Sequence, residues 1–258
     1  MNIPLNPEAK DQLLESVRNA LRIIKSFSTE EPEHRVTELA IRLGLSKSAV
    51  SRIMSTLASE GLILKGNSRG YRLGPTVVSL ASAFVAANEI CQEAKPILRN
   101  LADDVKEMAQ LAVLEGTTVI FLDSVEYKHP LRLFSHVGSR SPVHCSSSGK
   151  VLVAFHSESL VDEIIRDGLV AFTHQTITDA KIFIGELAKV REQGYAVSLE
   201  EKFEGVMAVA APIRNKFGEV VAAVNVVGPS YRMKPTNLEG YIRHLLRAAK
   251  EISSNLIS

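Results

Sequence analysis

The run from His144 to Lys150, His-Cys-Ser-Ser-Ser-Gly-Lys, concentrates side chain types that carry out chemistry in many proteins. A phosphate-binding loop needs a glycine where His144 stands and a serine or threonine where Val151 stands, so that motif is incomplete. His144 and Cys145 could in principle pair as base and nucleophile. Sequence neighbours rarely have the required geometry, however, and no third orienting group is evident. The sequence therefore predicts no catalytic residues here.

Metal binding is the other chemistry that these residue types allow. A structural zinc ion needs four ligands at characteristic spacings. The available candidates form no familiar pattern: His129, His136, His144 and Cys145. We expect no metal, no cofactor and no enzymatic activity in this chain.

The same run is better suited to binding an anion. Three serines precede Gly149, Lys150 and an apolar stretch, Val151–Phe155, that continues as a predicted helix. Free N–H groups at a helix start favour a carboxylate, and the serine hydroxyls and the Lys150 ammonium would add to that preference. The alternative is that the serines only cap the helix.

A second group of polar side chains follows Ser46. On one side of a predicted helix lie hydroxyls and cations, with no carboxylate before Glu60: Lys47, Ser48, Ser51, Arg52 and Ser55. Such a face, concentrated toward the helix start, suits the base edges and phosphates of the DNA major groove. An ordinary solvated face is the alternative, but solvated faces usually mix both charge signs.

Three amphipathic helices are predicted around this group. Apolar residues recur at i, i+3, i+4 and i+7 within 17–24, 36–43 and 50–57. Thr37 is the expected N-cap of the second helix, Gly44 its stop, and Ser46 the N-cap of the third. Two short helices joined by a tight glycine turn are typical of a helix-turn-helix.

A β-hairpin is predicted directly after the third helix. Two short strands, 62–65 and 71–73, flank the turn-forming run 66–70. A hairpin in this place is the wing of a winged helix, with Lys65 and Arg69 near the DNA backbone, and a plain structural turn is the alternative. The predicted DNA contacts are Ser46, Lys47, Ser48, Ser51, Arg52 and Arg69.

The charges are distributed unevenly along the chain. The 258 residues contain 30 Lys and Arg against 29 Asp and Glu, a formal net charge of +1. Residues 35–72 contain seven Lys or Arg and two Glu, a net charge of +5, so the rest of the chain sums to −4. The basic charge is therefore concentrated where the DNA-binding motif is predicted.

Composition excludes several protein classes. No apolar run approaches the length of a membrane helix, and the first residues lack the pattern of a secretory signal. Two cysteines, Cys91 and Cys145, are too few for a disulfide framework. We expect a cytoplasmic protein without membrane contact.

The remainder of the chain predicts a mixed α and β domain. An almost uncharged helix is expected over 76–88, and another from Pro96 to Met108. Strands are predicted at 111–114, 118–122, 131–134, 195–199, 207–211 and 220–227, with helices near 147–156, 159–167, 180–193 and 236–256. The links at 116–117 and 214–219 are too short for parallel crossovers, so a mainly antiparallel sheet is expected.

The order of these motifs resembles IclR-type transcriptional regulators. The run from Thr37 to Leu57 matches their helix-turn-helix, and Gly70-Tyr-Arg-Leu-Gly-Pro matches the exit from their wing. Further matches follow in family order: Pro142-Val-His-Cys-Ser-Ser-Ser-Gly-Lys, Gly194-Tyr-Ala-Val, Ala210-Ala-Pro-Ile and Ala222-Ala-Val-Asn-Val-Val-Gly-Pro. They extend from about residue 14 to 255.

The resemblance implies an α+β protein in three parts. These are a winged helix-turn-helix domain at 10–74, a helical linker at 75–94, and a GAF-like effector domain with a mainly antiparallel sheet at 95–258. It implies dimer contacts at the linker helix, whose packing onto the chain's own second domain is an equal alternative. It also implies effector contacts by Ser147, Ser148, Ser198, Val206, Ala208, Asn225 and Val227.

Two positions depart from the family pattern. Some members have an acidic residue at Ser198 and a cysteine at Ala208, and this chain has neither. We expect a homodimer or homotetramer that binds a double-stranded DNA operator and responds to a small organic acid. The alternatives are a small-molecule-binding enzyme with a vestigial winged helix and a winged helix that binds a protein partner.

Overall fold

The computed structural model describes residues 13–66, 70–127 and 136–256. The chain forms two compact units, and the boundary falls between Ala87 and Asn88. Each unit has its own hydrophobic core. Within the described residues, no helix has both the length and the apolar character needed to cross a membrane.

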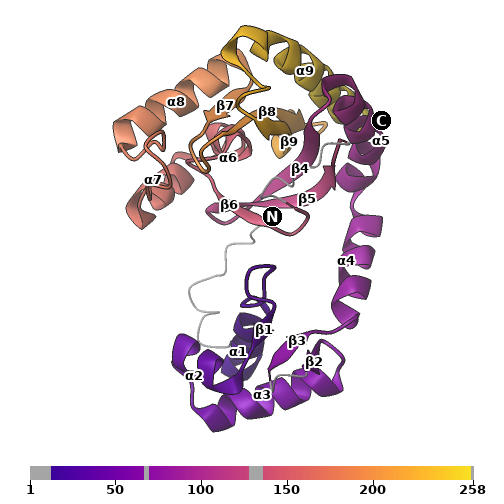
Figure 1. Cartoon of the computed structure of the whole chain (residues 1–258), viewed down its shortest axis with the longest axis vertical. Coiled ribbons are helices and arrows are strands. Elements are labelled where there is room, and N and C mark those ends of the chain that lie inside the picture. Colours follow the sequence, from indigo (N-terminus) through magenta and orange to yellow (C-terminus); the bar gives the residue numbers. More distant parts are fainter. Residues whose placement is uncertain (1–12, 67–69, 128–135, 257–258) are drawn as a thin grey trace. The chain divides into compact units, whose positions relative to one another are not determined.

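The first unit is a winged helix-turn-helix (Figure 1). Its helices are α1 (Glu15–Ile24), α2 (Val36–Leu43) and α3 (Lys47–Ser59), followed by α4 (Thr76–Ala87). The strands β1 (Glu33–His34), β2 (Ile63–Lys65) and β3 (Tyr71–Leu73) form an antiparallel sheet in the order β1-β3-β2. The predicted helices and the hairpin are confirmed, whereas β1 has too few residues to produce a recognisable pattern.

Local signals explain the sharp turn between α2 and α3. Gly44 ends α2 with φ +67°, a left-handed conformation that glycine adopts without strain. The Ser46 hydroxyl accepts a hydrogen bond from the Ala49 N–H at 3.2 Å and caps α3, as predicted. The prediction that Thr37 caps α2 is wrong, because the helix already begins at Val36 and Arg35 is its N-cap. The Glu38 carboxylate instead accepts from the Arg35 N–H at 2.9 Å.

The second unit contains a six-stranded antiparallel sheet in the order β6-β5-β4-β9-β8-β7. Its strands are β4 (Met108–Glu115), β5 (Thr118–Val125), β6 (Arg140–Pro142), β7 (Ala196–Leu199), β8 (Val206–Arg214) and β9 (Val220–Pro229). Its helices are α5 (Glu89–Val105), α6 (Ser147–Ala154), α7 (Glu158–Asp167), α8 (Ala180–Gln193) and α9 (Leu238–Asn255), the last preceded by the short helix η2 (Pro235–Asn237).

Helices cover both faces of this sheet (Figure 1). Helices α5 and α9 pack on each other and on β4, β8 and β9, whereas α6 packs on the opposite face with α8 behind it. Side chains alternate along a strand, so Ala112 of β4 and Ala223 of β9 face α6 and belong to its core cluster. The α6 face is the one that holds the candidate site.

Helix α5 is longer than the sequence predicted. The predicted helix start at Pro96 is wrong, because α5 begins at Glu89 and continues through Pro96. The Asn88 side chain accepts from the Cys91 N–H at 3.2 Å and provides the cap. The strand predicted at 131–134 lies outside the described residues.

Candidate functional site

The start of α3 presents a polar, cationic surface. Val50, Met54 and Leu57 are buried in the core of the first unit. The other side of the helix is exposed along five predicted DNA-contact residues: Ser46, Lys47, Ser48, Ser51 and Arg52. Arg69, the sixth predicted contact, lies outside the described residues. The α3 surface is therefore free of the core and has the chemistry that DNA phosphates and base edges bind.

Further cations lie on the elements next to α3 in the chain. Arg42 of α2 forms a salt bridge with Glu31 at 2.6 Å. The hydrogen bond from Arg42 lowers the pKa of Glu31, so this pair stays ionised well below neutral pH. Lys65 and Arg72, on the paired strands of the hairpin, are both exposed. Exposed cations therefore lie both on α3 and on the hairpin that follows it.

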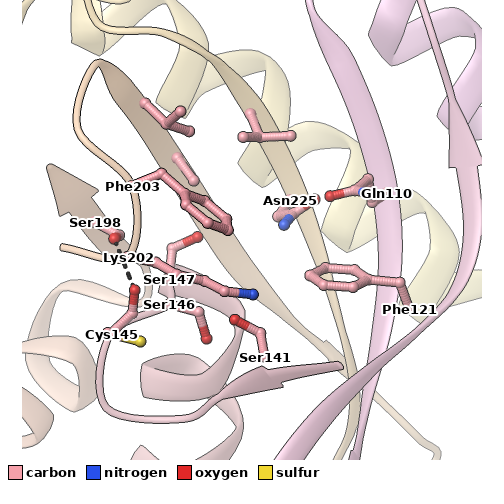
Figure 2. Close-up of a pocket in the computed structure, with 13 residues that line it drawn as sticks. Gln110, Phe121, Ser141, Cys145, Ser146, Ser147, Ser198, Lys202, Phe203 and Asn225 are labelled. Carbon is pink, nitrogen blue, oxygen red and sulfur yellow. Dashed lines mark hydrogen bonds between the residues drawn. The ribbon is translucent and has the colours of Figure 1, made fainter. Parts of the chain in front are cut away.

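The second unit contains a cavity of about 60 Å³ between the sheet and the start of α6 (Figure 2). Five predicted effector contacts besides Ser147 line it, and they come from β7, β8 and β9: Ser198, Val206, Ala208, Asn225 and Val227. Two residues of the His144–Lys150 run, Cys145 and Ser146, also line the cavity. The wall is completed by residues that the sequence did not predict: Gln110, Phe121, Ser141, Lys202 and Phe203. The cavity thus draws on segments about 115 residues apart in the chain.

Strand register explains why these residues meet. Gln110 on β4 lies directly opposite Asn225 on β9, so both carboxamides occupy one row of the α6 face. One row further on, Val227 pairs with Ala208, and Ala208 pairs with Ser198. These two rows of the sheet form one wall of the cavity. Gln110 could not be identified before its strand partner was known.

Helix α6 begins at the cavity with a serine cap. The Ser146 hydroxyl accepts from the Gly149 N–H at 3.1 Å and donates to the Pro142 carbonyl at 3.0 Å. The hydroxyls of Ser147 and Ser148 are buried and have no hydrogen-bond partner. Ser147 lines the cavity, whereas Ser148 is buried outside its lining. The serine run therefore caps the helix and also supplies an available hydroxyl to the cavity.

Lys150 does not contribute to an anion site, contrary to expectation. Its side chain is 1% exposed, and its ammonium contacts Glu201 at 2.7 Å and Glu186 at 3.4 Å. It also donates to the Val197 carbonyl at 2.5 Å. Burial raises the pKa of Glu201, although the Lys150 charge acts in the opposite direction. This lysine is a buried anchor for the loop that follows β7.

The asparagine in β9 has the environment that the sequence suggested. Asn225 is 4% exposed, and its side chain oxygen has no hydrogen-bond partner. Figure 2 shows its amide nitrogen pointing into the cavity. A buried polar atom without a partner costs about 1–3 kcal/mol, and a bound ligand can remove that cost.

The candidate nucleophile Cys145 and the candidate base His144 both have structural roles. Burial raises the pKa of the Cys145 thiol to about 12, which keeps it protonated at neutral pH. The His144 Nε2 lies 2.9 Å from the Val170 carbonyl, and the ring packs near Phe172. Within the described residues, no group of three or more His, Cys, Asp or Glu is arranged to hold a metal ion.

Comparison with known proteins decides the family. Residues 16–65 match the IclR helix-turn-helix domain, and residues 82–254 match the C-terminal domain of bacterial transcriptional regulators of the IclR type. This protein belongs to the IclR family of bacterial transcriptional regulators. Its IclR helix-turn-helix and effector domains confirm the predicted α+β fold class and make it a ligand-responsive, DNA-binding regulator.

Named relatives of this IclR-family protein are regulators. HTH-type transcriptional regulator BhcR of Paracoccus denitrificans is 34% identical over 220 residues, covering 84% of this chain and 79% of the relative. HTH-type transcriptional regulator XynR of Escherichia coli is 30% identical over 246 residues, covering 95% and 98%.

Solved IclR structures share the fold. A regulator from Alicyclobacillus acidocaldarius superposes with a TM-score of 0.86 at 29% identity, covering 95% of this chain and 99% of that chain. An IclR homolog from Microbacterium hydrocarbonoxydans, complexed with 4-hydroxybenzoate, has a TM-score of 0.79 at 26% identity, covering 94% and 99%.

Proposed function

We propose that this IclR-family protein binds a double-stranded DNA operator through α3 and its hairpin, and that a small organic acid in the effector cavity controls this binding. The single observation that carries the proposal is the pair of unpartnered polar groups, Ser147 and Asn225, buried at one cavity. A ligand with matching polar groups would bind there and stabilise the conformation that holds it. The 4-hydroxybenzoate complex of a related protein supports an acid as the ligand class.

The proposed DNA contacts are Ser46, Lys47, Ser48, Ser51, Arg52 and Arg69. The exposed cations and hydroxyls of α3 would contact bases and phosphates in the major groove, and Arg69 would hold the backbone. For the effector, we propose contacts by Ser147, Ser148, Ser198, Val206, Ala208, Asn225 and Val227. The unpartnered Ser148 hydroxyl would need a small shift of the α6 start to reach a ligand.

A homodimer or homotetramer is part of this proposal. Helix α4 has no buried residue within its unit and carries no charge along 76–87. Val78, Leu80 and Phe84 are more than half exposed. A second copy of the chain would remove this apolar surface from water and place two reading helices on a two-fold symmetric operator. Phe84→Asp is expected to lower the mass measured by light scattering to that of a smaller oligomer.

Neither alternative class has comparable support. An enzyme using Cys145 would need a thiolate, which burial disfavours. A partner-binding winged helix would not need the one-sided positive charge of α3. We therefore propose a non-enzymatic regulator, working in the cytoplasm where its DNA is, with no metal or organic cofactor.

The decisive experiment measures binding to DNA upstream of the protein's own gene. Arg52→Ala is expected to weaken specific binding about 10- to 100-fold, since one base contact contributes about 1–3 kcal/mol. Fluorescence anisotropy at several salt concentrations checks this, because phosphate contacts make affinity fall steeply with salt. Arg166→Ala, an exposed arginine on α7, is the matched control. If the folded oligomer binds DNA with an affinity that changes neither with salt nor with Arg52→Ala, the DNA-binding proposal is refuted.

A thermal-shift screen against small carboxylates tests the effector half. A ligand bound only to the folded protein raises its melting temperature, and a true effector also changes operator affinity. If a sugar or an uncharged aromatic compound raises the melting temperature and changes operator affinity, and no acid does so, the acid is the wrong ligand class.

A further inference from the structure

We propose that Lys202 is the charge-selecting residue of the effector cavity and that its ligand is a small hydroxycarboxylate. The inference rests on the proposed function, because it assumes that a ligand occupies the cavity. It goes further by assigning the counter-charge to a residue outside the serine run and by specifying the second polar group of the ligand.

Lys202 is the charged residue of a cavity that is otherwise neutral. None of the described residues that line the cavity is an aspartate or glutamate, and Lys202 is their single lysine or arginine. The adjacent carboxylate, Glu201, contacts Lys150 instead. A low-dielectric cavity with one positive charge favours an anion, because the attraction is screened less there than in water.

The position of Lys202 brings its ammonium to the polar end of the cavity. The residue lies on the loop between β7 and β8, and its ammonium donates to the Arg140 carbonyl of β6 at 3.2 Å. Figure 2 shows the side chain extending across the cavity toward Ser141, near Ser146 and Ser147. The positive charge of Lys202 lowers the pKa of the Cys145 thiol, although burial has a larger effect and raises it.

The loop that carries Lys202 is held at several points. Glu200 has φ +56°, an uncommon conformation for a residue other than glycine. The hydroxyls of Thr173 and Thr176 donate to the carbonyls of Glu200 and Glu201, each at 2.6 Å. The Glu201 side chain is tied to the buried Lys150. A supported loop of this kind presents Lys202 in one place, as a selective site requires.

The remaining groups of the cavity specify the rest of the ligand. The Ser147 hydroxyl and the Asn225 side chain oxygen are buried without partners, so a ligand needs a group that pairs with them. A hydroxyl both donates and accepts, whereas an amino group would be repelled by Lys202. Val206, Ala208 and Val227 form an apolar wall for a short carbon skeleton. A cavity of about 60 Å³ has room for a small acid of a few heavy atoms.

Isothermal titration calorimetry on the full chain tests this assignment. The probes are glycolate, lactate and 3-hydroxybutyrate, each compared with its uncharged primary amide and with the acid that lacks the hydroxyl. At least one hydroxy acid is expected to bind at least tenfold more tightly than its amide. The same hydroxy acid is expected to bind more tightly than the unsubstituted acid with the same number of carbons, which is acetate for glycolate, propionate for lactate and butyrate for 3-hydroxybutyrate. If every acid binds no better than its amide, or none binds, the inference is overturned.

Variants separate Lys202 from other sources of acid preference. Lys202→Met is expected to bring acid and amide affinities within about threefold, whereas Lys202→Arg keeps the preference. Lys216→Met removes an exposed lysine from the turn between β8 and β9 and should change nothing. An acid preference that persists in a folded Lys202→Met protein refutes the role of Lys202. Operator release by an uncharged compound would refute this inference while leaving the proposed regulator function intact.

Discussion

Helices α3 and α6 begin with the same local arrangement and serve different purposes. In each, a serine precedes the helix and accepts from the backbone N–H three residues later, at 3.2 Å for Ser46 and 3.1 Å for Ser146. At α3 the two residues that follow the cap, Lys47 and Ser48, are exposed, whereas every residue of α6 is buried. The same capping chemistry thus prepares one helix for the surface of DNA and the other for an enclosed ligand.

The lysines of these helices show what burial changes. Lys47 is exposed in the first turn of α3, where water screens its charge and a phosphate can replace that water. Lys150 is 1% exposed in α6, and its charge is balanced by Glu201 and Glu186. An exposed cation is available to a partner, whereas a buried one must be compensated within the fold. The position of a lysine in a motif therefore does not reveal its role.

Replacing each lysine by methionine is the strongest test of this contrast. Lys150→Met leaves the Glu201 carboxylate buried without its partner, and we expect a loss of about 3–5 kcal/mol in the free energy of unfolding of the second unit. Lys47→Met is expected to change stability by less than about 0.5 kcal/mol. Urea denaturation followed by hydrogen exchange of each unit measures both. Equal stabilities would show that Lys150 is not an anchor.

The Lys150→Met defect should also depend on pH. The pKa of Glu201 is already raised by burial, and without Lys150 it rises further. A raised folded pKa means that stability is present at low pH and is lost as pH rises through that pKa. The difference between Lys150→Met and the parent protein is therefore expected to be smaller at pH 4 than at pH 8.

Thiol reactivity provides the next largest effect. With a pKa of about 12 instead of 9.0, Cys145 has about a thousandfold less thiolate at pH 8 than an ordinary thiol. A cysteine introduced by Ser48→Cys lies exposed near the start of α3, where the helix dipole favours the thiolate. Alkylation followed by mass spectrometry is expected to modify position 48 at least a thousandfold faster than Cys145. Comparable rates would contradict the enclosed state of the α6 start.

Removal of the two serine caps is expected to have the smallest effect. Ser46→Ala should cost about 1 kcal/mol of stability, the ordinary value of an exposed cap. Ser146→Ala should cost about 2 kcal/mol, because it also leaves the Pro142 carbonyl without the donor it has in the folded unit. Thermal denaturation distinguishes the two. A larger loss for Ser46→Ala would reverse the contrast between the exposed and the buried helix start.

The DNA-binding unit was more predictable than the ligand cavity for a physical reason. The polar side of α3 follows from the spacing of Val50, Met54 and Leu57 within one helix, because helical periodicity separates buried from exposed positions. Gly44 and Ser46 mark the turn before it through local backbone preferences. The prediction needs only the fourteen consecutive residues from Gly44 to Leu57.

The cavity required information that no single segment carries. Gln110 joins Asn225 through strand pairing, and Lys202 enters from a loop that is positioned by Thr173, Thr176 and Lys150. Resemblance to the IclR family suggested several lining positions but not Lys202 or Phe203. Periodicity and the local concentration of positive charge predicted the winged helix-turn-helix, because both are properties of short segments. The regulator function was implied by the resemblance of the motif order to the IclR family. Which polar groups are buried together, and which lysine faces a ligand, depends on packing between distant segments, because desolvation and cross-strand register arise only when those segments meet.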